Sequence, residues 1–364
     1  MSNKKVLVLG AGNIGSLISF MFSQHDDYEV VLADRSMERA FKLFTDTKIS
    51  FATLDATDEV ALNSFIAIND FDVVVSALPY SCNKLVATLA VQNGAHYFDL
   101  TEDVSVKNHL REMDDRMFPN TILMPQCGLA PGFINIIGNH LMLQFDEVHT
   151  AKLRVGALPQ QVSNAFNYAL TWSTNGLVNE YGNPCEAIVN GKYVDNLQPL
   201  EGVEKLLIDG VEYEAFNTSG GLGTLADSWH NEVVNLNYKT LRYPGHCEKI
   251  RFLMNDMKLN DQRELLEKLL ENAIPVTKQD VIVIYSAVSG LKDGQLLEKS
   301  YVNKVYPKVI GGLEWTGIQV TTAAGACAAV DIALSNPDWK GFIAQERINA
   351  DDFLVNRFGM FYQM

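Results

Sequence analysis

Residues 5–15 read KVLVLGAGNIG, and this stretch decides the fold of the first part of the chain. Its first six residues form a short apolar run rich in valine and leucine, which is typical of a buried parallel strand. Gly10, Gly12 and Gly15 follow with GxGxxG spacing, and an apolar helical face continues directly after them. About 20 residues further on, Asp34 ends a second strand pattern at residues 29–34. This order of strand, glycine turn, helix and acidic residue predicts a dinucleotide-binding site.

The three glycines have separate physical roles in such a site. Gly10 permits the tight turn, Gly12 lets the backbone approach the pyrophosphate, and Gly15 lets the helix pack closely on the strand. The helix begins near Asn13 and Ile14, where free N–H groups and the positive end of the helix dipole favour a phosphate. All five residues are therefore predicted to bind the cofactor.

The acidic residue indicates which dinucleotide is bound. Asp34 can accept hydrogen bonds from the ribose hydroxyls and would repel a 2′-phosphate, so it favours NAD over NADP. Arg35 leaves NADP open, because a neighbouring arginine can accommodate that phosphate. We also expect a helix from about Ser36, which would serve as its N-cap.

Strand patterns recur along the first 128 residues, with helical stretches between them. After the two strands above they lie at residues 50–58, 71–79, 95–103 and 120–128. Repeated β-α units predict an α/β fold of the Rossmann type, a doubly wound parallel sheet with right-handed crossovers. Ligands of such sheets lie outside the carboxyl ends of the strands, near the switch in strand order.

This edge brings several candidate residues together. The segment after the fourth strand is predicted to line the cofactor, and it comprises Ser76, Ala77, Leu78 and Pro79. Candidates for the reacting end are Tyr80, Glu102, Asp103 and Cys127. Tyr80 could bind substrate or the nicotinamide amide, or serve in packing. Either acid could accept an ammonium group or cap a helix. Cys127 precedes a predicted helix at residues 130–145, whose N-terminus could lower the thiol pKa; a small buried cysteine is the alternative.

The regular alternation of strand and helix patterns stops after residue 128. Asn190-Gly191 and Asp209-Gly210 are hairpin signals between strand-like runs. Further strand patterns include residues 249–256, and residues 262–273 form an amphipathic helical pattern. The second half is therefore predicted to be an α+β domain with an antiparallel or mixed sheet.

The bulk composition excludes several classes of protein. The formal net charge of −15 argues against nucleic-acid binding, which needs basic faces. No uninterrupted apolar run reaches the ~18 residues of a membrane helix. Five cysteines with no metal-type spacing predict reduced thiols and no metal site. We expect a soluble, cytoplasmic protein.

A set of long, ordered strings carries a family resemblance over nearly the whole chain. They are GAGNIG, SALPY, CGLAPGF, TWSTNGLVNEYGNP, TSGGLGTL, YKTLRYPGH and QVTTAAGACAAVDIAL. On these strings the chain resembles the saccharopine dehydrogenase-like family, and most closely its lysine dehydrogenase members. Saccharopine-forming or -cleaving relatives tend to carry GLDPG where this chain has GLAPG at residues 128–132.

The resemblance implies an architecture and an activity. It implies a Rossmann domain at residues 1–128, an inserted α+β domain for substrate binding and dimerisation at 129–316, and a return to the Rossmann domain at 317–364. It also implies NAD(P)-linked chemistry at the C–N bond of an amino acid, with lysine deaminated oxidatively to its semialdehyde. A homodimer is expected on the same ground.

The chemistry of that reaction requires an anchor for the α-carboxylate and a proton handler. Arg242 is the candidate clamp, with Lys239 assisting or solvated, and His246 is the candidate proton shuttle. We expect these three, within YKTLRYPGH, to form a substrate loop. Other candidate substrate residues are Trp172, Thr218, Ser219 and Gly220. Structural roles in ion pairs, packing or an ordinary loop are the alternatives for each.

Two other functions remain open. One is a dehydrogenase or reductase for a secondary amine, such as saccharopine or a carboxylated polyamine of the carboxynorspermidine type. The other is a cofactor-binding sensor without catalysis, which would keep the glycines and Asp34 but would not need the cationic loop.

Overall fold

The computed structural model describes residues 3–44, 47–113, 118 and 120–363. The chain forms two compact units. Unit 1 comprises Met1–Phe133 and Thr321–Met364, and unit 2 comprises Ile134–Val320. The C-terminal segment therefore returns to the unit that contains the N-terminus.

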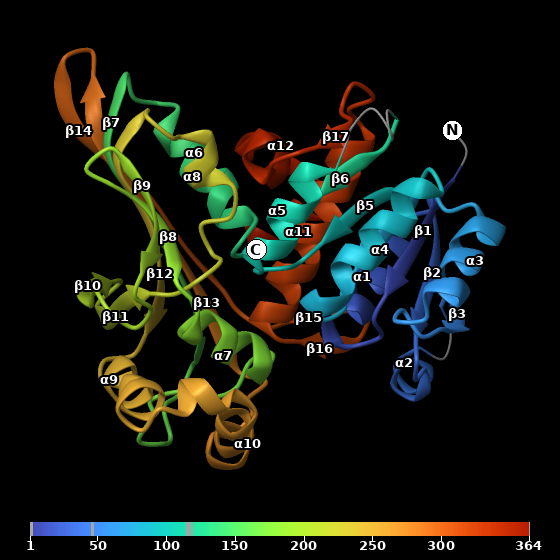
Figure 1. The fold of residues 1–364 in the computed structure, drawn as a ribbon, viewed down its shortest axis with the longest axis horizontal. Coiled ribbons are helices and arrows are strands. Elements are labelled where there is room, and N and C mark those ends of the chain that lie inside the picture. The colour runs from blue at the N-terminus through green and yellow to red at the C-terminus, as the bar shows by residue number, and fades with distance from the viewer. Residues whose placement is uncertain (1–2, 45–46, 114–117, 119, 364) are drawn as a thin grey trace. The chain divides into compact units, whose positions relative to one another are not determined.

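Unit 1 is built on a seven-stranded sheet with the order β17-β6-β5-β4-β1-β2-β3 (Figure 1). Its strands are β1 (Lys4–Leu9), β2 (Tyr28–Asp34), β3 (Ile49–Thr53), β4 (Val73–Ser76), β5 (His96–Asp99), β6 (Ile122–Met124) and β17 (Gly341–Phe342). All neighbours pair in parallel. The strand order reverses between β1 and β4, so the switch point lies at the end of β1. The predicted doubly wound α/β fold is confirmed.

Helices connect these strands and bury the sheet. They are α1 (Asn13–Ser23), α2 (Glu38–Leu43), α3 (Glu59–Asn69), α4 (Tyr80–Gln92), α5 (Val104–Glu112), α12 (Ala350–Val355) and α11 (Gly317–Leu334), whose residues from Thr321 onward belong to unit 1. Residues 6–9 of β1 are at most 1% exposed, as the apolar run predicts. The expected cap at Ser36 is wrong: α2 begins at Glu38, and the Ser36 N–H donates instead to Asp34.

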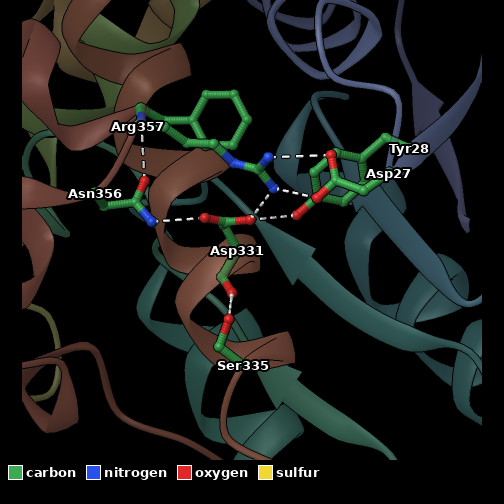
Figure 2. A network of polar contacts seen from close by, with 7 residues as sticks. Asp27, Tyr28, Asp331, Ser335, Asn356 and Arg357 are labelled. Atoms are coloured by element: carbon green, nitrogen blue, oxygen red, sulfur yellow. Dashed lines mark hydrogen bonds and ion pairs between the residues drawn. The ribbon is translucent and has the colours of Figure 1, made fainter. Parts of the chain in front are cut away.

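A polar network fixes the C-terminal segment to the sheet of unit 1 (Figure 2). Arg357 donates to both carboxylate oxygens of Asp27, at 3.0 and 2.6 Å, and to Oδ1 of Asp331 on α11, at 2.5 Å. Asp331 also accepts from the hydroxyl of Tyr28 on β2 and from the side-chain amide of Asn356. Two carboxylates thus share one guanidinium between the start of β2, α11 and the end of the chain.

Unit 2 contains an eight-stranded mixed sheet with the order β10-β11-β12-β7-β13-β14, in which β8 pairs with β12 and β9. Its strands are β7 (Glu147–Pro159), β8 (Cys185–Val189), β9 (Lys192–Leu197), β10 (Glu204–Ile208), β11 (Val211–Asn217), β12 (Val233–Arg242), β13 (Asp280–Lys292) and β14 (Gln295–Val305). Among the described residues of this sheet, β12 and β7 are the only two strands that pair in parallel. A separate small hairpin joins β15 (Lys308–Ile310) to β16 (Leu313–Trp315). The predicted mixed sheet is confirmed.

Both predicted hairpins form. Asn190-Gly191 joins β8 to β9, and Asp209-Gly210 joins β10 to β11. All four residues have positive φ, between 49° and 77°, as two-residue hairpin turns require.

The remaining helices are α6 (Phe133–Met142), α7 (Thr174–Gly182), α8 (Leu225–Ser228), α9 (His246–Arg251) and α10 (Arg263–Ala273). The helix expected at residues 130–145 begins later than predicted, so Pro131 precedes it. The strand expected at residues 249–256 is wrong, because this segment is helical. Buried residues Cys247, Ile250 and Met254, in and just before this segment, recur at helical spacing, which the short apolar run concealed.

One helix among the described residues, α11, is long and apolar enough to cross a membrane by length and composition alone. However, 72% of that helix is buried inside the protein, as in the core helices of folded domains. Its small residues allow close packing: a β-carbon on Gly325 would lie 2.7 Å from the carbonyl oxygen of Gly128.

Candidate active site

The glycine turn after β1 forms a cradle lined by backbone. Gly10 has φ +103°, and a β-carbon there would lie 2.7 Å from the carbonyl oxygen of Ala77. A β-carbon on Gly15 would overlap the carbonyl oxygen of Gly10, whereas one on Gly12 would meet no heavy atom within 4 Å. Helix α1 begins at Asn13 with no side chain capping its N-terminus. The turn therefore leaves open space beside unsatisfied N–H groups, which fits a pyrophosphate.

Asp34 lies at the carboxyl end of β2, directly beside this turn. Its Oδ2 accepts the N–H of Ala11 at 2.7 Å, and its Oδ1 accepts the N–H of Ser36 at 3.1 Å. Each carboxylate oxygen keeps a further lone pair for a ribose hydroxyl. Arg35 is exposed, and Arg39 on α2 donates to the side chain of Asn13. The half-exposed Ile14 completes the start of α1.

The segment after β4 lies against the glycine turn. Leu78 would contact a β-carbon on Gly10 at 3.4 Å, so this segment and the turn are neighbours. The hydroxyl of Ser76 is used by the protein, since it donates to Asn83 at 2.7 Å. Pro79 precedes α4, and the partly buried ring of Tyr80 packs on the apolar core of unit 1. The structure thus brings residues 76–79 to the predicted cofactor turn.

A buried carboxylate joins the ends of β5 and β6. Asp99 is 0% exposed and accepts hydrogen bonds from the N–H groups of Thr101 and Gln126 and from the hydroxyl of Tyr97, at 2.9–3.0 Å. Burial raises its pKa to about 6, although these three bonds favour the ionised form. Asp99 therefore holds two loops at the ligand-facing edge.

Cys127 is not an activated thiol. It is 1% exposed, and burial raises its pKa well above the ordinary value. Its Sγ donates to the carbonyl of Met124 and accepts from Nε2 of Gln345, while α6 begins only at Phe133. The expectation of a lowered pKa at a helix N-terminus is wrong, because the helix starts too far along the chain and burial dominates.

The two acids after β5 differ in role. Oδ1 of Asp103 accepts the N–H of Val106 and the hydroxyl of Ser105, so Asp103 is the N-cap of α5. The capping alternative is thus confirmed for Asp103. Glu102 is half-buried at the same edge, and its substrate role stays a prediction.

In unit 2, the YKTLRYPGH segment is not a loop. Residues 238–242 end strand β12, and His246 begins α9. Alternation along the strand puts Lys239 on the opposite face from Arg242. The substrate loop predicted from the Tyr-Pro-Gly sequence is therefore wrong, since only residues 243–245 form the turn.

Arg242 is 2% exposed within a cage of tyrosines. Its Nε donates to the hydroxyl of Tyr181 at 2.8 Å, and its Nη1 donates to Oγ1 of Thr240 and to the carbonyl of Leu241. The guanidinium also lies over the ring of Tyr168, 4.9 Å from its centroid. Neighbouring tyrosines and Glu180 hold the pKa of Arg242 above its usual range despite burial.

His246 continues this chain of hydrogen bonds as a neutral ring. It is 0% exposed, and burial, then Arg242, lower its pKa to about 3. Its Nδ1 must donate to the carbonyl of Phe166 at 2.8 Å, so its Nε2 accepts from the Tyr181 hydroxyl at 3.1 Å. The expectation that His246 shuttles a proton near neutral pH is wrong, because burial keeps the ring neutral.

The buried Arg154 and the partly buried Lys239 share one acid. Nε of Arg154 meets Oε1 of Glu204 at 2.5 Å, and Nζ of Lys239 lies 3.4 Å from Oε2 of the same residue. Lys239 also donates to the carbonyl of Gly202 at 2.6 Å, and burial lowers its pKa. Lys239 is neither solvated nor free to assist a substrate, because this acid already occupies it.

The small-residue turn after β11 is buried. Thr218 and Ser219 are 2% and 6% exposed, and Gly220 has φ +86°. The Ser219 N–H donates to the carbonyl of Glu180, while the Thr218 hydroxyl has no partner among the described residues. Trp172 packs beneath α7, which supports its packing alternative.

Within the described part of the chain, no group of three or more His, Cys, Asp or Glu side chains could hold a metal ion. The candidate residues fall into two separate groups, the glycine cradle within unit 1 and the cations of β12 within unit 2. The fit of the cradle to a pyrophosphate points to a dinucleotide cofactor.

Family comparisons agree with this geometry. Residues 6–118 match the saccharopine dehydrogenase NADP binding domain, and residues 128–357 match the saccharopine dehydrogenase C-terminal domain. The chain belongs to the saccharopine dehydrogenase family. It is accordingly a nicotinamide-dependent dehydrogenase that acts on the C–N bond of an amino acid, which confirms the class predicted from the sequence.

Members of the family align with most of the chain. The saccharopine dehydrogenase [NADP(+), L-glutamate-forming] of Saccharomyces cerevisiae is 25% identical over 86% of this chain and 72% of its own length. The mitochondrial alpha-aminoadipic semialdehyde synthase of Bos taurus is 22% identical, but this chain spans only 35% of it. The solved apo structure of the yeast L-Glu-forming enzyme has a TM-score of 0.76 at 18% identity, covering 96% of both chains, which shows the shared fold.

Sequence reasoning missed several residues of these clusters. Asp99 is the last residue of β5, just as Asp34 is the last residue of β2. This shared position could have identified Asp99 as a candidate site residue. Gln126 and Tyr181 carry no comparable signal, since burial and pairing across distant segments determine their positions.

Proposed function

We propose that this family member catalyses NAD-linked oxidation of the ε-amino carbon of L-lysine, with release of ammonia and formation of the semialdehyde. The lysine-dehydrogenase-like strings support lysine as the substrate. The proposal depends on which cations on the sheet of unit 2 already form ion pairs within the protein.

On that sheet, Arg154 and Lys239 form ion pairs with an acid, whereas Arg242 has only the charge of the nearby Glu180 acting on it. Arg154 and Lys239 both meet Glu204. Arg242 forms no ion pair with a carboxylate among the described residues, and its Nη2 forms no hydrogen bond with them. One guanidinium with a remaining donor nitrogen matches a substrate with one carboxylate, as in lysine. Saccharopine carries three carboxylates and would require more anchors.

The reaction needs a neutral amine before a hydride can leave its carbon. A lysine ammonium has a pKa of about 10.4, so the site must take one proton from the substrate first. When bound, the nicotinamide supplies the hydride acceptor. Water then adds to the substrate imine, and ammonia leaves to give the aldehyde. Glu102, at the carboxyl end of β5, is our proposed receiver of the ammonium group.

We propose NAD as the preferred cofactor, although the family model and the yeast relatives are named for NADP. Support comes from Asp34, whose carboxylate is held at the end of β2 by the N–H groups of Ala11 and Ser36. Its charge would repel a 2′-phosphate. Fluorescence titration should therefore give a lower Kd for NADH than for NADPH, and Asp34→Ser should reduce the difference. Equal or tighter NADPH binding by the unaltered protein would contradict this role.

A second candidate is the oxidation of saccharopine or a related secondary amine, because two relatives that each match 86% of this chain are named saccharopine dehydrogenases. Steady-state assays of NADH and NADPH formation with L-lysine, saccharopine and a panel of other amines separate the candidates. A higher kcat/KM for lysine supports the proposal, and a higher value for saccharopine would replace it. Tight cofactor binding without turnover of any amine would favour a sensor.

We also propose a cytoplasmic homodimer, on the family resemblance and the composition. Sedimentation equilibrium of the purified protein measures the assembly directly. A monomer at micromolar protein concentration would contradict the proposed dimer.

A further inference from the structure

Gln126 is an anomaly at the ligand-facing edge of unit 1. Its side chain is 1% exposed, and neither Oε1 nor Nε2 has a hydrogen-bond partner among the described residues. Most buried polar groups in proteins are paired, so an amide with both atoms unpaired requires an explanation. An amide in this state is suited to a ligand that offers both a donor and an acceptor.

The backbone at Gln126 is strained as well. Its φ is +67°, a left-handed conformation that few residues other than glycine adopt. The Gln126 N–H donates to Oδ1 of buried Asp99 at 2.9 Å, which holds the residue in this conformation. Strained residues that the surrounding structure enforces cluster at functional sites. The neighbouring Gln345 shows the contrast, because its Nε2 donates to the carbonyl of Pro125 and to Cys127.

Topology indicates which ligand group reaches this position. A dinucleotide crosses the switch point at the glycine turn, with its adenosine ribose at Asp34 on β2. The nicotinamide half must then extend to the other side, over the carboxyl ends of β4, β5 and β6. Gln126 lies two residues beyond the end of β6.

We propose that the side-chain amide of Gln126 pairs with the carboxamide of the bound nicotinamide. Oε1 of Gln126 accepts from the carboxamide NH2, and Nε2 donates to its carbonyl oxygen. Because the amide is covered in the free protein, the side chain must rotate toward the edge as the ring docks. The inference rests on the nicotinamide cofactor and is independent of the identity of the amine.

Binding of cofactor analogues without any amine tests this pairing. Reduced 3-acetylpyridine adenine dinucleotide replaces the carboxamide NH2 by a methyl group, so it loses the donor that Oε1 would accept. We expect the unaltered protein to bind NADH about tenfold more tightly than this analogue, as loss of a hydrogen bond that leaves a buried acceptor unpaired predicts. Kd values come from competition titrations of cofactor fluorescence.

Two variants complete the test. Gln126→Met keeps the volume but removes the amide, so it should weaken NADH binding and abolish the preference for NADH over the analogue. Gln345→Met is the matched control, since it removes a buried glutamine amide that already has partners; we expect the preference to persist there. If Gln126→Met is unstable, the analogue comparison in the unaltered protein still decides.

Equal affinity of the unaltered protein for NADH and the analogue would overturn the proposal, as would a preference that survives in Gln126→Met. The second result would leave a buried water or a substrate group as the partner of the amide. Failure of the unaltered protein to bind any nicotinamide dinucleotide would instead refute the proposed function.

Discussion

Replacement of Arg242 by methionine separates a substrate clamp from a purely structural arginine. The guanidinium donates to Tyr181, Thr240 and the carbonyl of Leu241, and its Nη2 makes no hydrogen bond with the described residues. Methionine fills a similar volume but provides no donor. Arg242→Met should therefore affect both the stability of unit 2 and the binding of a carboxylate.

The two effects have different magnitudes. Three protein acceptors lose their donor. At about 1 kcal/mol for each hydrogen bond, the free energy of unfolding should fall by about 3 kcal/mol. A hydrogen bond from Nη2 to a substrate carboxylate is charge-assisted and contributes about 1.5–3 kcal/mol, so kcat/KM for lysine should fall by about 10- to 150-fold.

Urea denaturation and steady-state kinetics, at a temperature where the variant is fully folded, measure the two effects. Arg154→Met is the matched control, because Arg154 is an equally buried cation of the same sheet that already pairs with Glu204. We expect it to lose stability and to keep kcat/KM near that of the unaltered protein. A fall of less than about tenfold for Arg242→Met, or an equal fall for Arg154→Met, would refute the clamp.

Three further perturbations test other parts of the account. Gly12→Ala should leave the unfolding midpoint unchanged, because a β-carbon there meets no protein atom within 4 Å, but it should raise the Kd for NADH at least about tenfold; unchanged affinity would contradict the cradle. His246 has a folded pKa of about 3, below its ordinary 6.5, so protonation favours the unfolded state. As the pH decreases below about 6.5, the free energy of unfolding should therefore fall by about 1.4 kcal/mol per pH unit. Urea midpoints across pH should show a shallower slope for His246→Gln, and parallel slopes would oppose this. Arg357→Met should lower the unfolding free energy of unit 1 by about 1–3 kcal/mol, because Asp27 and Asp331 lose their shared partner; an unchanged melting curve would show that the network contributes little.

The sequence predicted those parts of the protein that local patterns determine. The strand before Gly10, the helix after the glycine turn and Asp34 follow from residues close together in the chain. The hairpin turns at Asn190-Gly191 and Asp209-Gly210 follow from the backbone conformations that these residues favour. Such features need no information about distant segments.

Predictions failed where distant segments decide the outcome. Burial is the main cause of the low pKa of His246, and residues that pack on its ring, such as Tyr181, come from distant segments of the chain. Lys239 is committed because Glu204 lies on another strand. A Tyr-Pro-Gly sequence correctly indicated a turn, yet it could not reveal that Arg242 still belongs to the strand before it.

The proposed reaction transfers a hydride directly from the ε-carbon of lysine to the cofactor, and isotope labelling measures this transfer. The protein is incubated with NAD and L-lysine that carries deuterium on the ε-carbon, and the product NADH is analysed by mass spectrometry. We expect NADH that has gained a single deuterium, together with release of ammonia. Unlabelled NADH would contradict this transfer. So would deuterated NADH that forms only when labelled saccharopine replaces lysine in the incubation.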